Sequence, residues 1–237
     1  MKKVGIIGGM GSLASAHLYE LIVKMTDAKK DQEQLELIIH NYPAIYDRTD
    51  YILGKSFDNP IYQLLVSGNH LIEQGCNIIG IPCVTAHYFY GALKIHLNVD
   101  IINVIDETVQ YLRRKHISKV GLMATDGTIQ TKIFQKELNR NNIDVIVPDE
   151  HNQRNVMHVI YDDVKSGNDI TTSAFDEAST YLQNNHAQAI ILGCTDLSVV
   201  KKELNLDFYF VDCLEILSYA ILQRCHKDID SNYAYLN

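Results

Sequence analysis

The stretch "KVGIIGGMGS", residues 3–12, decides the fold because a similar stretch occurs later in the chain. Its counterpart, "KVGLMATDGT", covers residues 119–128 and begins 116 residues further on. Each copy is a short apolar run that leads through glycine and polar residues into a helical pattern, which is typical of a buried parallel strand followed by a crossover helix. Self-similarity at a long spacing indicates a duplicated module. The sequence therefore predicts two similar halves.

A second pair of stretches repeats in the same order. "NIIGIPCVTAH", residues 77–87, and "QAIILGCTDLS", residues 188–198, are apolar and β-branched until a cysteine, and polar after it. The two cysteines, Cys83 and Cys194, are 111 residues apart, close to the spacing of the first pair. Each half is therefore expected to carry a thiol at the end of an equivalent strand.

Short β-branched runs alternate with longer helical patterns along the whole chain, which indicates an α/β fold with mostly parallel strands. We predict two pseudo-symmetric α/β domains, each with a four-stranded sheet flanked by helices, and an active site in the cleft between them. The domains expected are 1–105 plus 214–237, with a returning C-terminal helix, and 106–213. The expected strands are 3–8, 35–41, 77–82, 101–104, 119–124, 144–148, 188–193 and 208–211. The expected helices are 12–29, 60–75, 86–97, 106–116, 128–142, 151–166, 171–186, 197–205 and 213–227.

Composition restricts the class of protein. The chain has 237 residues, of which 46% are hydrophobic and 21% charged, as in ordinary globular proteins. A net charge of −8 disfavours nucleic acid as a partner, because nucleic-acid binders usually display a basic face. No apolar run approaches the roughly 20 residues that a membrane helix needs, and the start "MKKVGIIGGMG" lacks the pattern of a signal peptide. We therefore predict a cytoplasmic protein.

Five cysteines, an odd number without CxxC pairs, indicate reduced thiols. The ten histidines form no HExxH or similar ligand pattern, so no metal site is predicted. Cys76, Cys213 and Cys225 have no counterpart in the other half and are expected to be structural.

Cys83 and Cys194 suit a particular chemistry if the halves face each other about a pseudo-two-fold axis. Inverting a carbon centre by proton transfer needs a base on one face and an acid on the other. Helix starts follow both thiols, with Thr85 and Thr195 placed as caps, and a helix N-terminus promotes thiol ionisation. A buried cysteine is more often a small packing residue, but equivalent positions in a repeat favour a shared chemical role.

Five motifs, spread in order over nearly the whole chain, carry a resemblance. They are "GIIGGMGS" (5–12), "DRTDYILG" (47–54), "PCVTAH" (82–87), "YDDVKSGN" (161–168) and "GCTDLS" (193–198). In them the chain resembles the aspartate/glutamate racemase superfamily, and most of all its aspartate racemase branch. The resemblance implies a racemase without pyridoxal phosphate or any other cofactor, acting on an acidic amino acid, aspartate first and glutamate next, and forming a homodimer.

The resemblance also implies roles for particular residues. Cys83 and Cys194 would be the two acid/base groups, and Arg48 and Lys165 would hold substrate carboxylate. Further residues expected to line the substrate site are Met10, Gly11, Val84, Thr85, Thr128 and Thr195.

Two of these assignments have alternatives in the residues themselves. Arg48 is expected in a long loop after the second strand, where its guanidinium can bind a carboxylate at two points or form a surface salt bridge with Asp47 or Asp50. Lys165 is expected near a helix end, where a cation also complements the helix dipole.

The chain departs from the family pattern at Val84, where asparagine is usual. Valine neither donates nor accepts a hydrogen bond, so a contact of about 1 kcal/mol is missing and the substrate stays open. Ser12 stands where proline is frequent, and is expected to be tolerated as a helix cap.

Other functions remain open at this point. "GGMGSLA" contains the G-x-G-x-x-A pattern of dinucleotide sites, but the second strand ends in His40 and Asn41 rather than an acidic residue. Broad-specificity amino-acid racemisation, hydantoin racemisation and maleate isomerisation also fit paired cysteines, whereas a decarboxylase of this fold typically needs one. A ligand-binding protein that has lost the chemistry is the remaining alternative.

Overall fold

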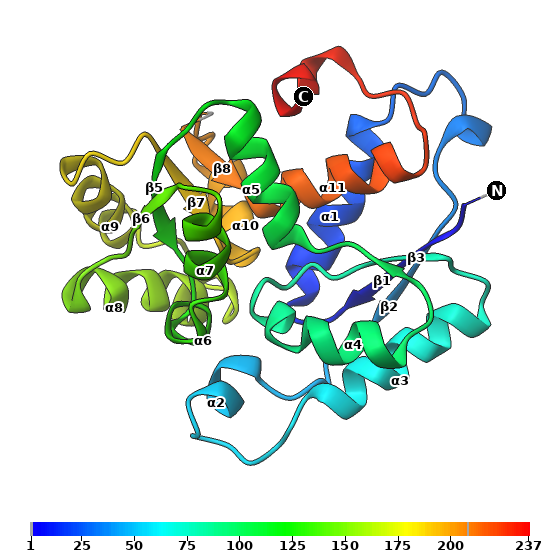
Figure 1. Ribbon diagram of the computed structural model, residues 1–237, viewed down its shortest axis with the longest axis horizontal. Coiled ribbons are helices and arrows are strands. Elements are labelled where there is room, and N and C mark those ends of the chain that lie inside the picture. Colours follow the sequence, from blue (N-terminus) through cyan, green and yellow to red (C-terminus); the bar gives the residue numbers. More distant parts are fainter. Residues whose placement is uncertain (1, 208) are drawn as a thin grey trace.

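The computed structural model describes residues 2–207 and 209–237, which contain two parallel four-stranded sheets (Figure 1). The first sheet has the order β2-β1-β3-β4 and the second the order β6-β5-β7-β8. Each strand of one sheet thus has its counterpart at the same place in the other. The predicted α/β class and the predicted pair of similar sheets are confirmed. The strands are β1 (Val4–Gly8), β2 (Leu37–Asn41), β3 (Ile78–Gly80), β4 (Asp100–Ile101), β5 (Lys119–Met123), β6 (Asp144–Ile146), β7 (Ala189–Leu192) and β8 (Phe210–Asp212).

Helices cover the sheets of both halves, as expected for parallel sheets whose two faces are apolar. The helices that precede β5 in the chain are α1 (Ser12–Met25), η1 (Asp31–Glu33), α2 (Arg48–Ile52), α3 (Ile61–Glu73), η2 (Thr85–Phe89), α4 (Tyr90–His96) and α5 (Val104–Arg114). The remaining helices are α6 (Asp126–Thr131), α7 (Ile133–Arg140), α8 (Glu150–His158), η3 (Val159–Val164), α9 (Thr172–Asn184), α10 (Asp196–Glu203), α11 (Cys213–Arg224) and η4 (Ser231–Leu236).

The helix α11 connects the two halves. It returns from the second sheet and packs against α1, α5 and β3, as Figure 1 shows for α1 and α5. Leu214 and Leu217 of α11 are fully buried in a hydrophobic cluster that also contains Ile6 of β1 and Val120 of β5. One apolar core thus runs through both halves, and the domain limits 1–105 plus 214–237 and 106–213 stay a prediction.

Three expected helices are interrupted. The expected helix 128–142 is two helices, because Lys132 between α6 and α7 has a φ of 56° in the left-handed region. The expected helix 151–166 continues from α8 into the π-helix η3, and the expected helix 86–97 begins as the 3₁₀ helix η2. Helical periodicity detects such segments but does not reveal a single reversed residue or a change of winding.

The prediction that Arg48 lies in a loop is wrong, because Arg48 is the first residue of α2. The Asp47 side chain caps this helix by accepting a hydrogen bond of 2.9 Å from the backbone N–H of Asp50. With only five residues, α2 is too short to show a helical period in sequence. It places Arg48 beside the second half, because α2 packs against α6.

Within residues 2–207 and 209–237, no helix has the length and apolar character needed to cross a membrane. The same residues contain no cluster of three or more His, Cys, Asp or Glu side chains arranged to hold a metal ion.

Candidate active site

The two cysteine segments lie side by side at the interface between the halves. Cys83 follows β3 and Cys194 follows β7, each at the carboxyl end of its strand. The hydroxyl of Thr195 donates a hydrogen bond of 2.9 Å to the backbone oxygen of Pro82, so the residues next to the two cysteines are in direct contact. Both cysteines are free thiols and almost fully buried. The structure thus brings together the two thiols that the repeat singled out.

The two threonines near the cysteines differ from the prediction that both act as helix caps. Thr195 occupies the N-cap position of α10 but makes no side-chain capping hydrogen bond, and Val84 rather than Thr85 occupies the N-cap position of η2. The Thr85 hydroxyl instead lies 2.9 Å from that of Thr125 and 3.1 Å from that of Thr128, both in the second half. These hydroxyls find partners across the interface rather than at their own helix ends.

Ser12 is likewise not the cap of α1. Gly11 occupies the cap position and Ser12 is the first helical residue. Close approach explains the glycine, since a Cβ at Gly11 would lie 3.2 Å from Oδ1 of Asp196. Gly9 is needed for a different reason: its φ is +93°, and a Cβ there would overlap the backbone of Tyr42.

The Arg48 guanidinium is buried between the loops that follow β1 and β2. It donates to three backbone oxygens, those of Met10, Ile45 and Tyr46, at 3.2, 3.3 and 3.1 Å. Its Nε is buried and finds no hydrogen-bond partner in the described part of the chain. A buried donor without a partner is unfavourable, and the same guanidinium is within hydrogen-bonding reach of Cys83.

Arg48 also lies close to Cys83. Burial alone would lower the pKa of Arg48, but the neighbouring Cys83 and Asp47 raise it above its ordinary value. The guanidinium therefore stays charged, and a negative charge on the Cys83 sulfur would be stabilised by it.

Cys194 has the opposite surroundings. Its sulfur donates a hydrogen bond of 3.5 Å to Oδ2 of Asp196. The same oxygen forms a salt bridge of 2.7 Å with Nζ of Lys165. Burial and the Asp196 carboxylate raise the pKa of Cys194 well above its ordinary value. Burial would lower the pKa of Lys165, but Asp196 and Cys194 raise it, so this lysine stays charged.

A cavity of about 400 Å³ opens beside these groups. Its walls come from both halves and include Met10, Gly11, Asp47, Arg48, Lys165 and Asp196. Four predicted substrate-binding residues are therefore among its lining residues. The cysteines are not, but Cys194 contacts Asp196 and Cys83 lies close to Arg48.

The other predicted substrate-binding residues lie deeper in the interface. Thr85, Thr128 and Thr195 are buried and bonded as described above. The Val84 side chain is 1% exposed and belongs to the apolar core. An asparagine at this position would place its amide among apolar side chains, and the direct contact with substrate that we expected for residue 84 stays a prediction.

Asp196 and Tyr161 were missed in the sequence. Asp196 occupies the position equivalent to Thr85 when the halves are aligned on their cysteines, so that alignment would have found it. The Tyr161 hydroxyl donates to Oδ2 of Asp47 at 3.2 Å and joins η3 to the start of α2. Lys165 lies over the same tyrosine ring, 5.6 Å from its centroid. The π-helical winding of η3 could not be read from the sequence.

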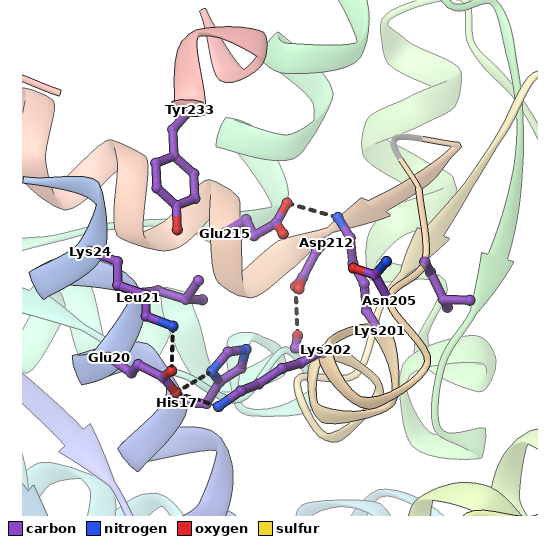
Figure 2. A pocket seen from close by; sticks show the side chains of 12 residues that line it. His17, Glu20, Leu21, Lys24, Lys201, Lys202, Asn205, Asp212, Glu215 and Tyr233 are labelled. Atoms are coloured by element: carbon purple, nitrogen blue, oxygen red, sulfur yellow. Dashed lines mark hydrogen bonds and ion pairs between the residues drawn. The ribbon is translucent and has the colours of Figure 1, made fainter. Parts of the chain in front are cut away.

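A second cavity, of about 220 Å³, lies between α1, α10 and α11 (Figure 2). Its charged side chains are paired with one another. Lys201 binds Glu215 at 2.8 Å, and Glu20 is contacted by His17, Lys24 and Lys202, as the dashed lines in Figure 2 indicate. With these charges already neutralised, the cavity offers a ligand few unsatisfied groups.

The buried pair Lys201–Glu215 leads to a stability prediction. Lys201→Met should destabilise the protein by about 3–5 kcal/mol at neutral pH, because it leaves the Glu215 carboxylate buried without its cation. Burial and Asp212 already raise the pKa of Glu215. The loss should therefore be smallest below about pH 4, where glutamate is protonated in the folded and the unfolded chain, and should increase as the pH rises. Urea unfolding between pH 4 and 8 measures this.

The double variant Lys201→Met/Glu215→Leu is the control for that prediction. Removing both charges should restore most of the stability, because no uncompensated charge remains. A double variant as unstable as Lys201→Met alone would mean that the lysine acts through packing or through its 3.0 Å hydrogen bond to the Phe210 oxygen.

The chain is similar to known racemases over nearly its whole length. The model of the Asp/Glu/hydantoin racemase family matches residues 7–218. The structure of Picrophilus torridus aspartate racemase superposes with a TM-score of 0.85 at 29% identity and covers 100% of this chain and 99% of its own. The broad specificity amino-acid racemase RacX of Bacillus subtilis is 26% identical over 216 residues, 88% of this chain and 92% of that protein. A glutamate racemase from Francisella tularensis in complex with D-glutamate has the same fold, with a TM-score of 0.67 at 20% identity, covering 97% of this chain and 84% of that one. The chain therefore belongs to the Asp/Glu/hydantoin racemase family.

Proposed function

We propose that this protein racemises an acidic amino acid, aspartate first and glutamate next, without a cofactor, using Cys83 and Cys194 as the two acid/base groups. The observation that carries the proposal is that two buried thiols from opposite halves lie in neighbouring segments. The hydrogen bond between Thr195 and Pro82 links these segments. The similarity to an aspartate racemase along the whole chain supports the substrate class.

The reaction needs two proton transfers on opposite faces of the α-carbon. The thiolate of one cysteine takes the α-proton, and the bonding electrons remain on the substrate as a carbanion conjugated with its carboxylate. The thiol of the other cysteine then gives its proton to the opposite face, which forms the enantiomer. The two sulfurs have exchanged protonation states, so the reverse reaction uses them in the opposite roles.

The cavity offers distinct groups to an acidic substrate. The Arg48 side chain lines the cavity and its guanidinium remains charged, so it can bind one carboxylate. The first backbone N–H groups of α1, at Ser12 and Leu13, have no partner within the helix and can bind the second carboxylate. Lys165 is already engaged by Asp196. These donors lie on one wall, which suits a small molecule with two carboxylates.

A second candidate is racemisation of amino acids with other side chains. The cavity wall also includes Leu13, Pro43, Ile45 and Val164, which can contact an apolar side chain. The similarity to RacX of Bacillus subtilis points in the same direction. Hydantoin racemisation, maleate isomerisation and ligand binding without catalysis remain alternatives in the same family. The homodimer implied by the resemblance and the cytoplasmic location predicted from the sequence are part of the proposal.

Hydrogen exchange at the α-carbon tests the proposal directly. The protein is incubated in deuterium oxide, without pyridoxal phosphate, with each enantiomer of aspartate, glutamate, leucine and lysine, and the α-proton signal is followed by NMR. Inversion is measured in parallel by chiral chromatography. Exchange with inversion is expected for aspartate, more slowly for glutamate, and only weakly for leucine and lysine.

The panel separates the alternatives. Equal exchange rates for leucine, lysine and aspartate would show a broad specificity and refute the preference for acidic substrates. No exchange with any amino acid, while aspartate still raises the melting temperature, would indicate a binding protein and refute racemisation.

A further inference from the structure

Asp196 is a buried carboxylate that contacts one of the two thiols. It is the first residue of α10, two positions after Cys194, and is 2% exposed. Burying a carboxylate is costly unless it is paired and hydrogen-bonded. Its Oδ2 has both kinds of partner, Lys165 Nζ at 2.7 Å and the Cys194 sulfur at 3.5 Å. The three residues form a chain that ends at the sulfur.

Among the residues that the structure describes, no carboxylate is hydrogen-bonded to the Cys83 sulfur. The residue equivalent to Asp196 in the first half is Thr85, whose hydroxyl bonds to the neutral hydroxyls of Thr125 and Thr128. The charged group near Cys83 is instead the Arg48 cation. Cys194 therefore contacts a carboxylate that is paired with an ammonium group, whereas Cys83 lies beside a guanidinium cation.

We propose that Asp196 is a positioning residue that keeps the proton on Cys194 in the substrate-free protein; this inference rests on the proposed function. Cys83, which lies beside the Arg48 cation, is then left to act as the base. The two thiols are unequal before any substrate arrives. An amino acid whose α-hydrogen faces Cys83 meets a base at once, whereas its enantiomer must wait for the proton to move between the sulfurs.

Charged and polar groups from several elements face Cys194. Asp196 of α10 accepts the S–H, and a negative charge on Cys83 across the interface further disfavours a second thiolate. Lys165, which follows η3, and the backbone N–H of Asp196 act in the opposite sense. Tyr161 of η3 is also near Cys194, and burial raises the pKa of Tyr161 so that it stays neutral.

Lys165 also has a role after Cys194 has given up its proton. When Cys194 gives its proton to the substrate, its thiolate is left near the Asp196 carboxylate. The Lys165 ammonium, 2.7 Å from the oxygen that held the S–H, limits this repulsion. Lys165 thus acts through Asp196 instead of binding substrate carboxylate.

Alkylation of the substrate-free protein tests the inference. Wild type and Asp196→Asn are treated with iodoacetamide between pH 6 and 11, and modification of each cysteine is quantified by peptide mass spectrometry. In the wild type, Cys83 should be modified at lower pH than Cys194. Asp196→Asn keeps the side-chain shape but removes the charge, and should lower the pH midpoint of Cys194 by about one unit or more, roughly a ten-fold faster modification at neutral pH. The Cys83 midpoint should move less.

Two further variants complete the test. Lys165→Met should move the Cys194 midpoint upward, which gives a shift of opposite sign even if Asp196→Asn folds poorly. Asp176→Asn, the same substitution on the exposed surface of α9, should move neither midpoint. Equal midpoints for the two cysteines in the wild type, or an unchanged Cys194 midpoint in both site variants, would overturn the inference.

The alkylation experiment needs no substrate, so its result tests the role of Asp196 independently of the racemase reaction. Racemisation together with unshifted midpoints would reject only the role of Asp196. Shifted midpoints in a protein that exchanges no α-hydrogen would reject only the racemase reaction.

Discussion

Cys194→Ser is expected to abolish racemisation of aspartate, with kcat at least about 10²–10⁴-fold lower than in the wild type. A serine hydroxyl occupies nearly the same place but is a far weaker acid than a thiol, so it cannot donate the second proton at a useful rate. Cys83 is unchanged in this variant. It should still exchange the α-hydrogen of the one enantiomer that faces it, without inversion.

The paired variant Cys83→Ser should show the complementary behaviour. Its α-hydrogen exchange, where detectable, should be restricted to the other enantiomer, because only the Cys194 face retains a thiol. Deuterium incorporation by NMR and enantiomer ratio by chiral chromatography measure the two effects in one sample. One-sided exchange distinguishes loss of an acid/base group from loss of the fold.

Cys225→Ser is the matched control, because Cys225 lies just after α11 and lines neither the cavity at Arg48 nor the cysteine interface. It should racemise as the wild type does. Wild-type activity in Cys83→Ser or Cys194→Ser would remove that cysteine from the mechanism.

Arg48→Met should have the second largest effect, a fall in kcat/KM for aspartate of about 10²–10³-fold. The substitution removes the guanidinium that we assign to a substrate carboxylate, and with it the cation beside Cys83. It also leaves the backbone oxygens of Met10, Ile45 and Tyr46 without their donor. Each buried group left unpaired costs about 1–3 kcal/mol, so the melting temperature should fall as well.

Arg48→Lys separates the charge from the shape of the guanidinium. Lysine keeps a positive charge near Cys83 but cannot reach three carbonyls and a substrate oxygen with the same planar group. We expect KM for aspartate to rise while kcat falls less than in Arg48→Met. Steady-state kinetics with both enantiomers, beside denaturant unfolding, resolve these effects. An Arg48→Met protein with unchanged kcat/KM would exclude Arg48 from substrate binding.

The architecture could be predicted because it depends on patterns that extend over many residues. The apolar runs at β1 and β7 are buried along their whole length, so their β-branched composition is visible in sequence. The repeat of residues 3–12 at 119–128 then fixed the similarity of the two sheets, since duplicated modules keep their strand order. The limits of most strands and helices fell within a few residues of those expected.

What could not be predicted depends on single residues or on contacts across the interface. The break at Lys132 comes from one left-handed residue, and the five residues of α2 cannot show a period. Thr85 and Thr195 have the composition of helix caps, and only the packing of the halves shows that their hydroxyls bond elsewhere. Asp196 was overlooked because its partner Lys165 is distant in sequence.

The threonine contacts across the interface have a consequence for how such a chain changes over generations. Thr85 depends on hydroxyls at 125 and 128, while Thr195 depends on a carbonyl at 82, so each half completes the hydrogen bonding of the other. A substitution in one cysteine segment is compensated only by a change 40 or more positions away in the chain. We therefore expect positions 85, 125 and 128 to vary together among relatives, and neither half to keep its thiol in place when expressed alone. The duplication that created two copies of one module has thereby made them inseparable.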